Sequence, residues 1–399
     1  MHLRRGIGAS VIDMTRKMWV SAVVALLAAV ALSGCALAQA AEPSDSMEDV
    51  DKYYRAIDVM AMLLLGFGFL MAFIRGYGRS ALGATLLLVS VGLIAYVVIR
   101  SLGVFGVAPS DIDTLILAEF ATASLLICAG AALGRLKMPQ YVVLGVIFIP
   151  FYMVNEWIIL GGGLGILSAG GFVDTGGSIV IHAFGAFFGL GVVLTMTTAS
   201  EFKTQIAADQ TSDKFSLLGT MVLWIFWPSF CAALVLPEKV PSTALNVLMA
   251  LCGSTLATYV ASTAIRGKMS VSDLANAALA GGVAIGATCD HASFPVAILI
   301  GVLAGTLSTI GFAVIQPRLQ GRLKAVDTCG VTNLHGFPGL MGGVAAMVVV
   351  AGIALQTQAL GIAVTLVVAL LAGLLAGKIL SALGRKEKPY EDSEDFTEA

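Results

Sequence analysis

Two of the chain's four histidines lie in a stretch of sequence that occurs twice. The first copy, DTGGSIVIHAFG, begins at Asp174, and the second, DTCGVTNLHGFP, begins at Asp327. His182 and His335 each follow the aspartate of their copy by eight residues. A neutral imidazole can both donate and accept a hydrogen bond, so a facing pair could bind a small polar molecule, carry a proton or ligate a metal ion.

A metal site or a nucleophilic enzyme finds little further support in the sequence. If the repeated segments are helical, each aspartate is about 12 Å from its histidine, too far for the two to share a metal ion. The sequence contains no HExxH motif and no serine or cysteine nucleophile motif. We expect no metal, no cofactor and no enzymatic activity. An intramembrane enzyme built on the two histidines and a metal is the alternative, and it lacks a third ligand.

The cysteines do not form a CxxC pair, and most lie in apolar segments. They are Cys35, Cys128, Cys231, Cys252, Cys289 and Cys329. This spacing does not fit a zinc site or a disulfide framework, so we expect buried and unreactive thiols.

The composition is that of a membrane protein. Of the 399 residues, 58% are hydrophobic and only 12% are charged, whereas a soluble domain carries about 25% charged residues. The formal net charge of -2 does not suggest a nucleic-acid partner. The 45 glycines suit helices that pack closely in a lipid bilayer.

The amino-terminal segment resembles a secretory signal peptide. Arg16 and Lys17 precede an apolar run that ends near Leu32, and small residues with an A-x-A pattern follow. We therefore expect residues 1–40 to be a signal peptide. An uncleaved extra helix and lipidation at Cys35 are the alternatives. Each of these readings places the following polar segment outside the cell.

Eleven apolar segments, each long enough to cross a bilayer, follow the signal peptide. They lie near 54–74, 80–99, 112–134, 140–160, 174–198, 215–236, 242–265, 272–288, 294–316, 329–352 and 358–382. If the first segment runs from outside to inside, lysine and arginine gather in the cytoplasmic loops. The outer loops then carry only Arg100 and Lys239. The positive-inside rule therefore predicts an outer amino terminus and a cytoplasmic carboxyl terminus.

In this topology the two histidine segments enter the membrane from opposite sides. The first five helices (53–200) and the next five (213–353) then form an inverted repeat, followed by a last helix (358–382). The transmembrane domain covers 41–384. The tail, 385–399, is acidic and polar, and we expect it to be a flexible or docking segment. Both imidazoles should reach the middle of the membrane, where two polar groups are costly unless they serve a function.

Asp174 and Asp327 can cap the starts of their helices, because a carboxylate accepts hydrogen bonds from the free N–H groups there. Glu156, at the outer end of the fourth predicted helix, could attract cations to the pore entrance or could simply be a solvated helix end.

Four stretches of the sequence resemble the Rh branch of the ammonium transporter/Rh superfamily. They are VNEWIIL at 154–160, LWIFWPSF at 223–230, LANAALAGGVAIG at 274–286 and DTCGVTNLHGFPGLMGG at 327–343. The resemblance extends from about Asp51 to Phe396. It implies an ammonia/ammonium channel, a homotrimer with one pore in each subunit, and a location in the bacterial inner (plasma) membrane.

The resemblance also assigns roles to individual residues. It implies that His182 and His335 are twin histidines lining a narrow apolar pore, and that Phe120 and Phe230 form the pore gate. Asp174 matches the acid of the family motif, with Asp327 as its counterpart in the inner repeat. Glu156 matches the acid that in Rh proteins replaces an aromatic ammonium-binding site, so Glu156 and Asp174 are expected at the vestibule, where protons are handled.

Two features depart from the family pattern. Cys231 follows Phe230 where the family motif often has asparagine, and the loop that contains Asp290 and His291 reads CDHASF. These two residues could tune entry to the pore or could be ordinary loop residues.

The mechanism we expect is passage of neutral ammonia. A dry, low-dielectric pore disfavours ammonium, so the ion should lose its proton near Glu156, pass the phenylalanines and histidines as ammonia, and regain a proton inside. Carbon dioxide, another small neutral molecule, is an alternative substrate. Electrogenic or proton-coupled ammonium transport and a sensor role through the tail are further alternatives.

Overall fold

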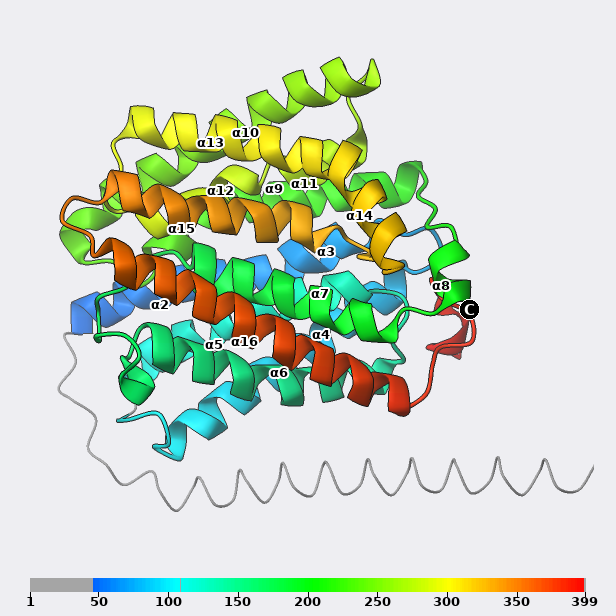
Figure 1. Cartoon of the computed structure of the whole chain (residues 1–399), viewed down its shortest axis with the longest axis horizontal. Coiled ribbons are helices and arrows are strands. Elements are labelled where there is room, and N and C mark those ends of the chain that lie inside the picture. The colour runs from blue at the N-terminus through cyan, green and yellow to red at the C-terminus, as the bar shows by residue number, and fades with distance from the viewer. Residues whose placement is uncertain (1–45, 108, 398–399) are drawn as a thin grey trace, which may run out of the picture.

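The computed structural model describes residues 46–107 and 109–397, and every regular element in these ranges is a helix. The predicted signal peptide and Cys35 lie outside the described residues. Most long helices run roughly parallel to one another and form an elongated bundle (Figure 1). The predicted all-helical membrane fold is confirmed for the described part of the chain.

The first half of the bundle consists of helices before residue 197. These are α2 (Ser46–Ala61) with its continuations η1 (Met62–Phe67) and α3 (Gly68–Met71), α4 (Gly78–Ser101), α5 (Asp111–Ala132), α6 (Met138–Ile159), the short η2 (Gly163–Gly165), η3 (Ser178–Ala183) and α7 (Phe184–Met196). The short α8 (Ala199–Lys203) links this half to the second.

The second half repeats this arrangement with more interruptions. It contains α9 (Gln210–Ala232), η4 (Pro237–Lys239), α10 (Val240–Arg266), α11 (Val271–Ala277), α12 (Ala280–Ile285), η5 (Gly286–Thr288), α13 (Phe294–Ile310), η6 (Gly311–Ile315), α14 (Gln316–Leu323), η7 (Thr332–Gly336) and α15 (Phe337–Val349). The last long helix, α16 (Leu355–Ala382), and the short η8 (Asp392–Glu394) complete the chain.

Ten helical stretches in the described residues are long and apolar enough to cross a membrane. The remaining predicted segment, 329–352, forms η7 and α15, which follow each other directly. Two of the differences from the predicted boundaries affect the site. The segment 272–288 is broken into α11, α12 and η5, and residues 174–177 form a turn ahead of η3 rather than the first turn of a helix.

Close approach of helix backbones depends on glycine at two contacts. A Cβ atom at Gly301 of α13 would lie 2.0 Å from the carbonyl oxygen of Ala250 in α10. A Cβ atom at Gly373 of α16 would lie 2.1 Å from the carbonyl oxygen of Phe188 in α7. Van der Waals packing between such close backbones stabilises helix pairs in a bilayer, where lipid chains remove the hydrophobic driving force.

The carboxyl-terminal tail is docked against one end of the bundle, which we call the tail end (Figure 1). The Tyr390 backbone N–H donates to Gly134 O at 2.9 Å. The Asp392 carboxylate accepts from the Ser80 backbone N–H at 2.8 Å, at the start of α4. The buried Lys386 ammonium pairs with Asp395. Of the two expectations for this segment, docking is the one observed.

Candidate functional site

His182 and His335 meet in the interior of the bundle. Their Nδ1 atoms are 3.2 Å apart, within hydrogen-bond distance. The two rings are nearly parallel, with centroids 5.3 Å apart and an interplanar angle of 12°. Both side chains are buried. The repeated sequence segments therefore bring the two imidazoles together, as predicted.

Each histidine lies in a π-helical turn that an aspartate caps. His182 is in η3 and His335 is in η7. The Asp174 carboxylate accepts from the backbone N–H groups of Ile179 and Val180 at 2.9 and 2.8 Å. The prediction that the aspartate caps its helix is correct, although it does so from the preceding turn.

The second copy has the same arrangement. Asp327 accepts from the backbone N–H groups of Val331 and Thr332, each at 3.0 Å. Gly177 and Gly330 precede the two helices with φ of +72° and +66°, a backbone conformation that glycine adopts without strain. The two halves of the chain thus build each histidine helix from the same capped turn.

Aromatic rings continue the histidine stack on both sides. The Trp227 ring lies 5.6 Å from His182 at an interplanar angle of 22°. The Phe67 ring lies 6.4 Å from His335 at 23°. The sequence analysis did not single out either residue. Trp227 could have been found, because it precedes Phe230 by three residues and so shares its helix face.

Phe120 and Phe230 are in contact, with ring centroids 4.7 Å apart. Phe230 also lies 5.9 Å from His182, ring to ring. The two phenylalanines are 6% and 2% exposed, so they fill the space beside His182. The His182 Nε2 atom has no hydrogen-bond partner among the described residues. The geometry fits a closed aromatic gate on one side of the histidine pair.

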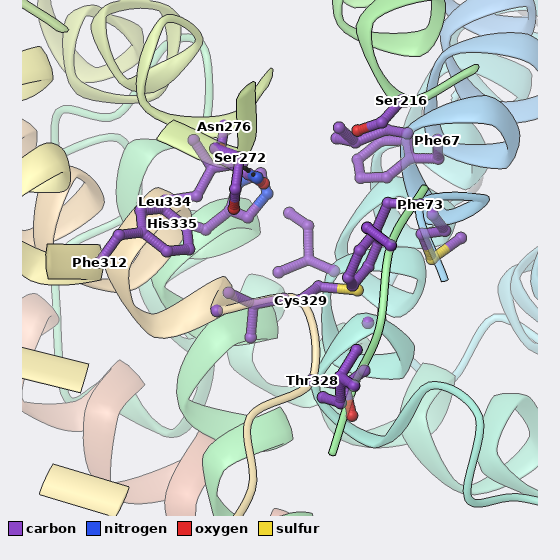
Figure 2. Close-up of a pocket in the computed structure, with 18 of the residues that line it drawn as sticks. Phe67, Phe73, Ser216, Ser272, Asn276, Phe312, Thr328, Cys329, Leu334 and His335 are labelled. Carbon is purple, nitrogen blue, oxygen red and sulfur yellow. Dashed lines mark hydrogen bonds between the residues drawn. The ribbon is translucent and has the colours of Figure 1, made fainter. Parts of the chain in front are cut away.

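A cavity of about 260 Å³ reaches His335 from the tail end. Figure 2 shows His335 and Leu334 on one wall and Phe67 and Phe73 on the facing wall. The walls are mixed: Ser216 and Asn276 are polar, whereas the phenylalanines are apolar. His335 lines this tail-end cavity and His182 does not, so the pair is open on one side and closed by aromatic rings on the other.

Glu156 lies at the end of α6 opposite the tail and is only 9% exposed. The Tyr96 hydroxyl of α4 donates to its Oε2 atom at 2.7 Å. The neighbouring Asn155 is fully buried, and neither of its amide atoms has a hydrogen-bond partner among the described residues. The carboxylate is therefore oriented by a tyrosine within the bundle and is not a solvated helix end. Tyr96 carries no sequence signal of this role, because it lies in an apolar helix 60 residues from Glu156.

Metal ligands do not gather near the histidines. In residues 46–107 and 109–397, no group of three or more histidine, cysteine or acidic residues could hold a metal ion. Cys128, Cys231 and Cys289 are buried free thiols, as predicted, whereas Cys252 and Cys329 are only partly buried. The two imidazoles are thus placed to form hydrogen bonds with each other and with a small molecule.

The fold and the site define a polytopic helical membrane protein with a buried imidazole pair between a cavity and a pair of contacting phenylalanines. The model of the Ammonium Transporter Family matches residues 18–396. The chain belongs to this family and is one of its Rh-type members. Its relatives are transporters, so the chain is not classed as an enzyme.

Relatives of known sequence and structure support this assignment. The chain is 36% identical to "Ammonium transporter Rh type A" of Bos taurus over 374 residues, which cover 89% of this chain and 85% of the relative. It is 36% identical to "Ammonium transporter Rh type B" of Oryzias latipes over 379 residues, which cover 84% of this chain and 80% of the relative.

Among solved structures, Rh50 of Nitrosomonas europaea aligns with a TM-score of 0.87 and 49% identity, covering 89% of this chain and 94% of Rh50. Candida albicans Mep2 aligns with a TM-score of 0.70 at 17% identity, covering 83% of each chain. The similarity to Mep2, at 17% identity, shows the fold alone.

Proposed function

We propose that the chain is an ammonia/ammonium channel in which neutral ammonia passes the histidine pair. The observation that carries the proposal is the 3.2 Å contact between the Nδ1 atoms of His182 and His335. The pair lies between the tail-end cavity and the contact of Phe120 with Phe230. Membership of the ammonium transporter family supports the same substrate.

The Nδ1 contact constrains the hydrogen bonds that the pair can offer. One imidazole must donate its Nδ1 proton and the other must accept it, because two facing donors or two facing acceptors would repel. The donor ring then has an Nε2 acceptor, and the acceptor ring has an Nε2–H donor. Ammonia can both accept and donate hydrogen bonds, so the pair can guide it without becoming charged.

A charged ion in this interior would lose its hydration, and few polar groups are placed to replace it. We therefore place proton release before the gate, near Glu156 and Asp174, and proton uptake in the tail-end cavity. Phe120 and Phe230 form the gate through which ammonia reaches His182. Asp327 holds the inner histidine helix as Asp174 holds the outer one.

The orientation and assembly of the channel are also proposals. Lysine and arginine concentrate in the loops at the tail end, which supports a cytoplasmic tail and a chain that spans the bacterial plasma membrane. A homotrimer with one pore in each subunit is proposed by analogy with the family. Large apolar side chains such as Leu256, Leu299 and Val348 are exposed on the bundle, which suits contact with lipid or with another subunit.

The test is internal pH in proteoliposomes after an ammonium jump, measured by stopped flow. Wild-type protein should alkalinise the lumen faster than empty liposomes, and the His182→Ala/His335→Ala protein should change that rate. Tyr259→Phe, at an exposed position of α10, is the matched control. If folded wild-type protein behaves as empty liposomes do, ammonia conduction is wrong and carbon dioxide becomes the next substrate to test. A membrane current would indicate electrogenic transport.

A further inference from the structure

The turn that begins the His182 helix is tied to the loop that follows η5. The Thr175 hydroxyl donates to Asp290 Oδ1 at 2.8 Å. The Gly176 backbone N–H donates to Gly286 O at 2.7 Å. Ser178 adds a third connection, because its hydroxyl donates to a carbonyl oxygen of α12 at 2.6 Å. Three contacts within residues 175–178 thus join the first half of the chain to the second beside the histidine pair.

Two basic side chains lie beside Asp290. Its second carboxylate oxygen, Oδ2, lies 3.3 Å from Lys239 Nζ and 3.5 Å from His291 Nε2. The Asp290 side chain is 11% exposed, whereas Lys239 and His291 are 40% and 35% exposed. One carboxylate oxygen therefore faces the two basic groups, and the other is left to accept from Thr175.

The corresponding turn of the second half is held differently. Thr328 occupies the position of Thr175, directly after the capping aspartate. Its backbone N–H donates to Ala131 O at 3.0 Å, and the next residue, Cys329, donates to Gly130 O at 3.2 Å. Main-chain bonds thus hold both turns, and the Asp290 carboxylate holds the His182 turn in addition.

The additional bond gives the loop that contains Asp290 a structural role beside the histidine pair. Asp290 acts on His182 indirectly. It accepts a hydrogen bond from Thr175, the residue next to Asp174, and Asp174 caps the helix that carries His182. A shift of this turn would move His182 relative to Phe230, whose rings are 5.9 Å apart. The spacing between His182 and Phe230 is therefore sensitive to the position of the turn.

We propose that Asp290 is a positioning residue of the pore, which sets through Thr175 the spacing between His182 and the gate and so the size of molecule that passes. The inference rests on the proposed ammonia channel. It predicts that breaking the Thr175–Asp290 bond changes discrimination between ammonia and its larger methylated analogue, methylamine. Asp290 acts here through the protein and does not bind the substrate.

The experiment compares two substrates in the same proteoliposomes. Internal pH is followed after ammonium and after methylammonium jumps, and the ratio of the two protein-dependent rates is taken. A smaller amount of folded protein lowers both rates equally and leaves the ratio unchanged. Thr175→Val and Asp290→Ala should each shift the ratio by roughly threefold or more, because each removes the bond that fixes Thr175 and a small shift of the turn changes the spacing at His182.

Matched variants separate positioning from a general loss of structure. Thr175→Ser keeps the hydroxyl and should keep the wild-type ratio. Thr306→Val removes a hydroxyl that bonds only within α13, to Val302 O at 2.8 Å, and should also keep it. The Thr175→Val/Asp290→Ala protein should resemble the single variants, because both changes remove the same bond.

The outcomes distinguish this inference from the proposed function. An unchanged ratio in Thr175→Val and Asp290→Ala proteins that still conduct would overturn the positioning role. Independent, multiplying shifts in the double variant would overturn the shared bond as its cause. A wild-type protein that conducts neither substrate would instead contradict the proposed channel.

Discussion

The Nδ1 atoms of His182 and His335 lie 3.2 Å apart although the residues are 153 positions apart in the chain. Neither half of the chain can form this contact alone, because each supplies one ring from its own capped π-helical turn. The contact also fixes which ring nitrogen can donate, since only one proton can lie between the two Nδ1 atoms. The pair is therefore one hydrogen-bonding unit.

Replacing either histidine should change conduction about as much as replacing both. In His182→Ala or His335→Ala protein, the remaining ring loses its Nδ1 partner and its hydrogen-bond pattern is no longer fixed. We expect each single variant to alter the ammonia-dependent alkalinisation rate, and the double variant to add less than the product of the two effects. Stopped-flow pH measurements on equal amounts of reconstituted protein provide the comparison. Fully multiplying effects would show that the two rings act independently.

Shortening Phe230 should open the closed side of the histidine pair. Its ring contacts both Phe120 and His182, and its side chain is 2% exposed. Phe230→Leu should raise the rate for ammonia and admit water, which osmotic shrinkage of proteoliposomes can measure. Phe230→Ala removes more of the barrier but also costs about 3–5 kcal/mol of folding free energy, so Phe230→Leu is the variant to interpret first. Unchanged rates for ammonia and water would argue against a gate at this contact.

Neutralising Glu156 should lower the local concentration of ammonium at the pore entrance without blocking the pore. Glu156→Gln keeps an oxygen to accept from the Tyr96 hydroxyl, now 2.7 Å from Oε2, but removes the negative charge. We expect slower transport at low ammonium concentration and an unchanged rate at saturation, because the charge acts on the local ion concentration. Tyr96→Phe keeps the charge and is the matched control. An identical concentration dependence in wild-type and Glu156→Gln proteins would remove Glu156 from ion capture.

The sequence was sufficient to predict the parts of the site that depend on periodicity and repetition. The repeated segments identified both histidines and both capping aspartates, and hydropathy identified the helices. The spacing also suggested straight helices from Asp174 and Asp327, which is wrong, because a turn of four residues, 174–177, precedes η3. A hydropathy pattern averages over a whole segment. It does not reveal a turn, or a change from α-helical to π-helical hydrogen bonding.

Residues that act through contacts between distant segments were not predictable in the same way. Tyr96 and Trp227 belong to apolar helices in which any aromatic residue suits the composition, and their partners are far away in the sequence. Asp290 was noticed only because its loop differs from the family pattern, and its bond to Thr175 depends on the packing of the two halves. Such contacts arise from tertiary structure, which local sequence patterns do not specify.

The docked tail should be released at high pH through ionisation of Tyr390. This side chain is 5% exposed, and burial, the largest cause, raises its pKa above the usual 10.0. The Tyr390 hydroxyl therefore has a lower pKa when the tail is undocked than when it is docked. As the pH rises, ionisation stabilises the undocked tail first. Docking should thus be stable below pH 10 and weaken as the pH rises through about 10 and beyond. Limited proteolysis of residues 385–397 in detergent, with the cleaved fraction measured by mass spectrometry, follows the release.

Two variants identify the tail contacts responsible. Tyr390→Phe retains the ring that covers Gly134 but cannot ionise, so its cleavage should depend less on pH between about 9 and 11. Asp392→Ala loses the cap on α4 and should expose the tail at neutral pH, since a lost cap costs about 1 kcal/mol. Both expectations follow from a tail held by Gly134 and by the start of α4. If wild-type and Tyr390→Phe tails are cleaved with the same pH dependence, another group controls release, and the Lys386–Asp395 pair is the next to substitute.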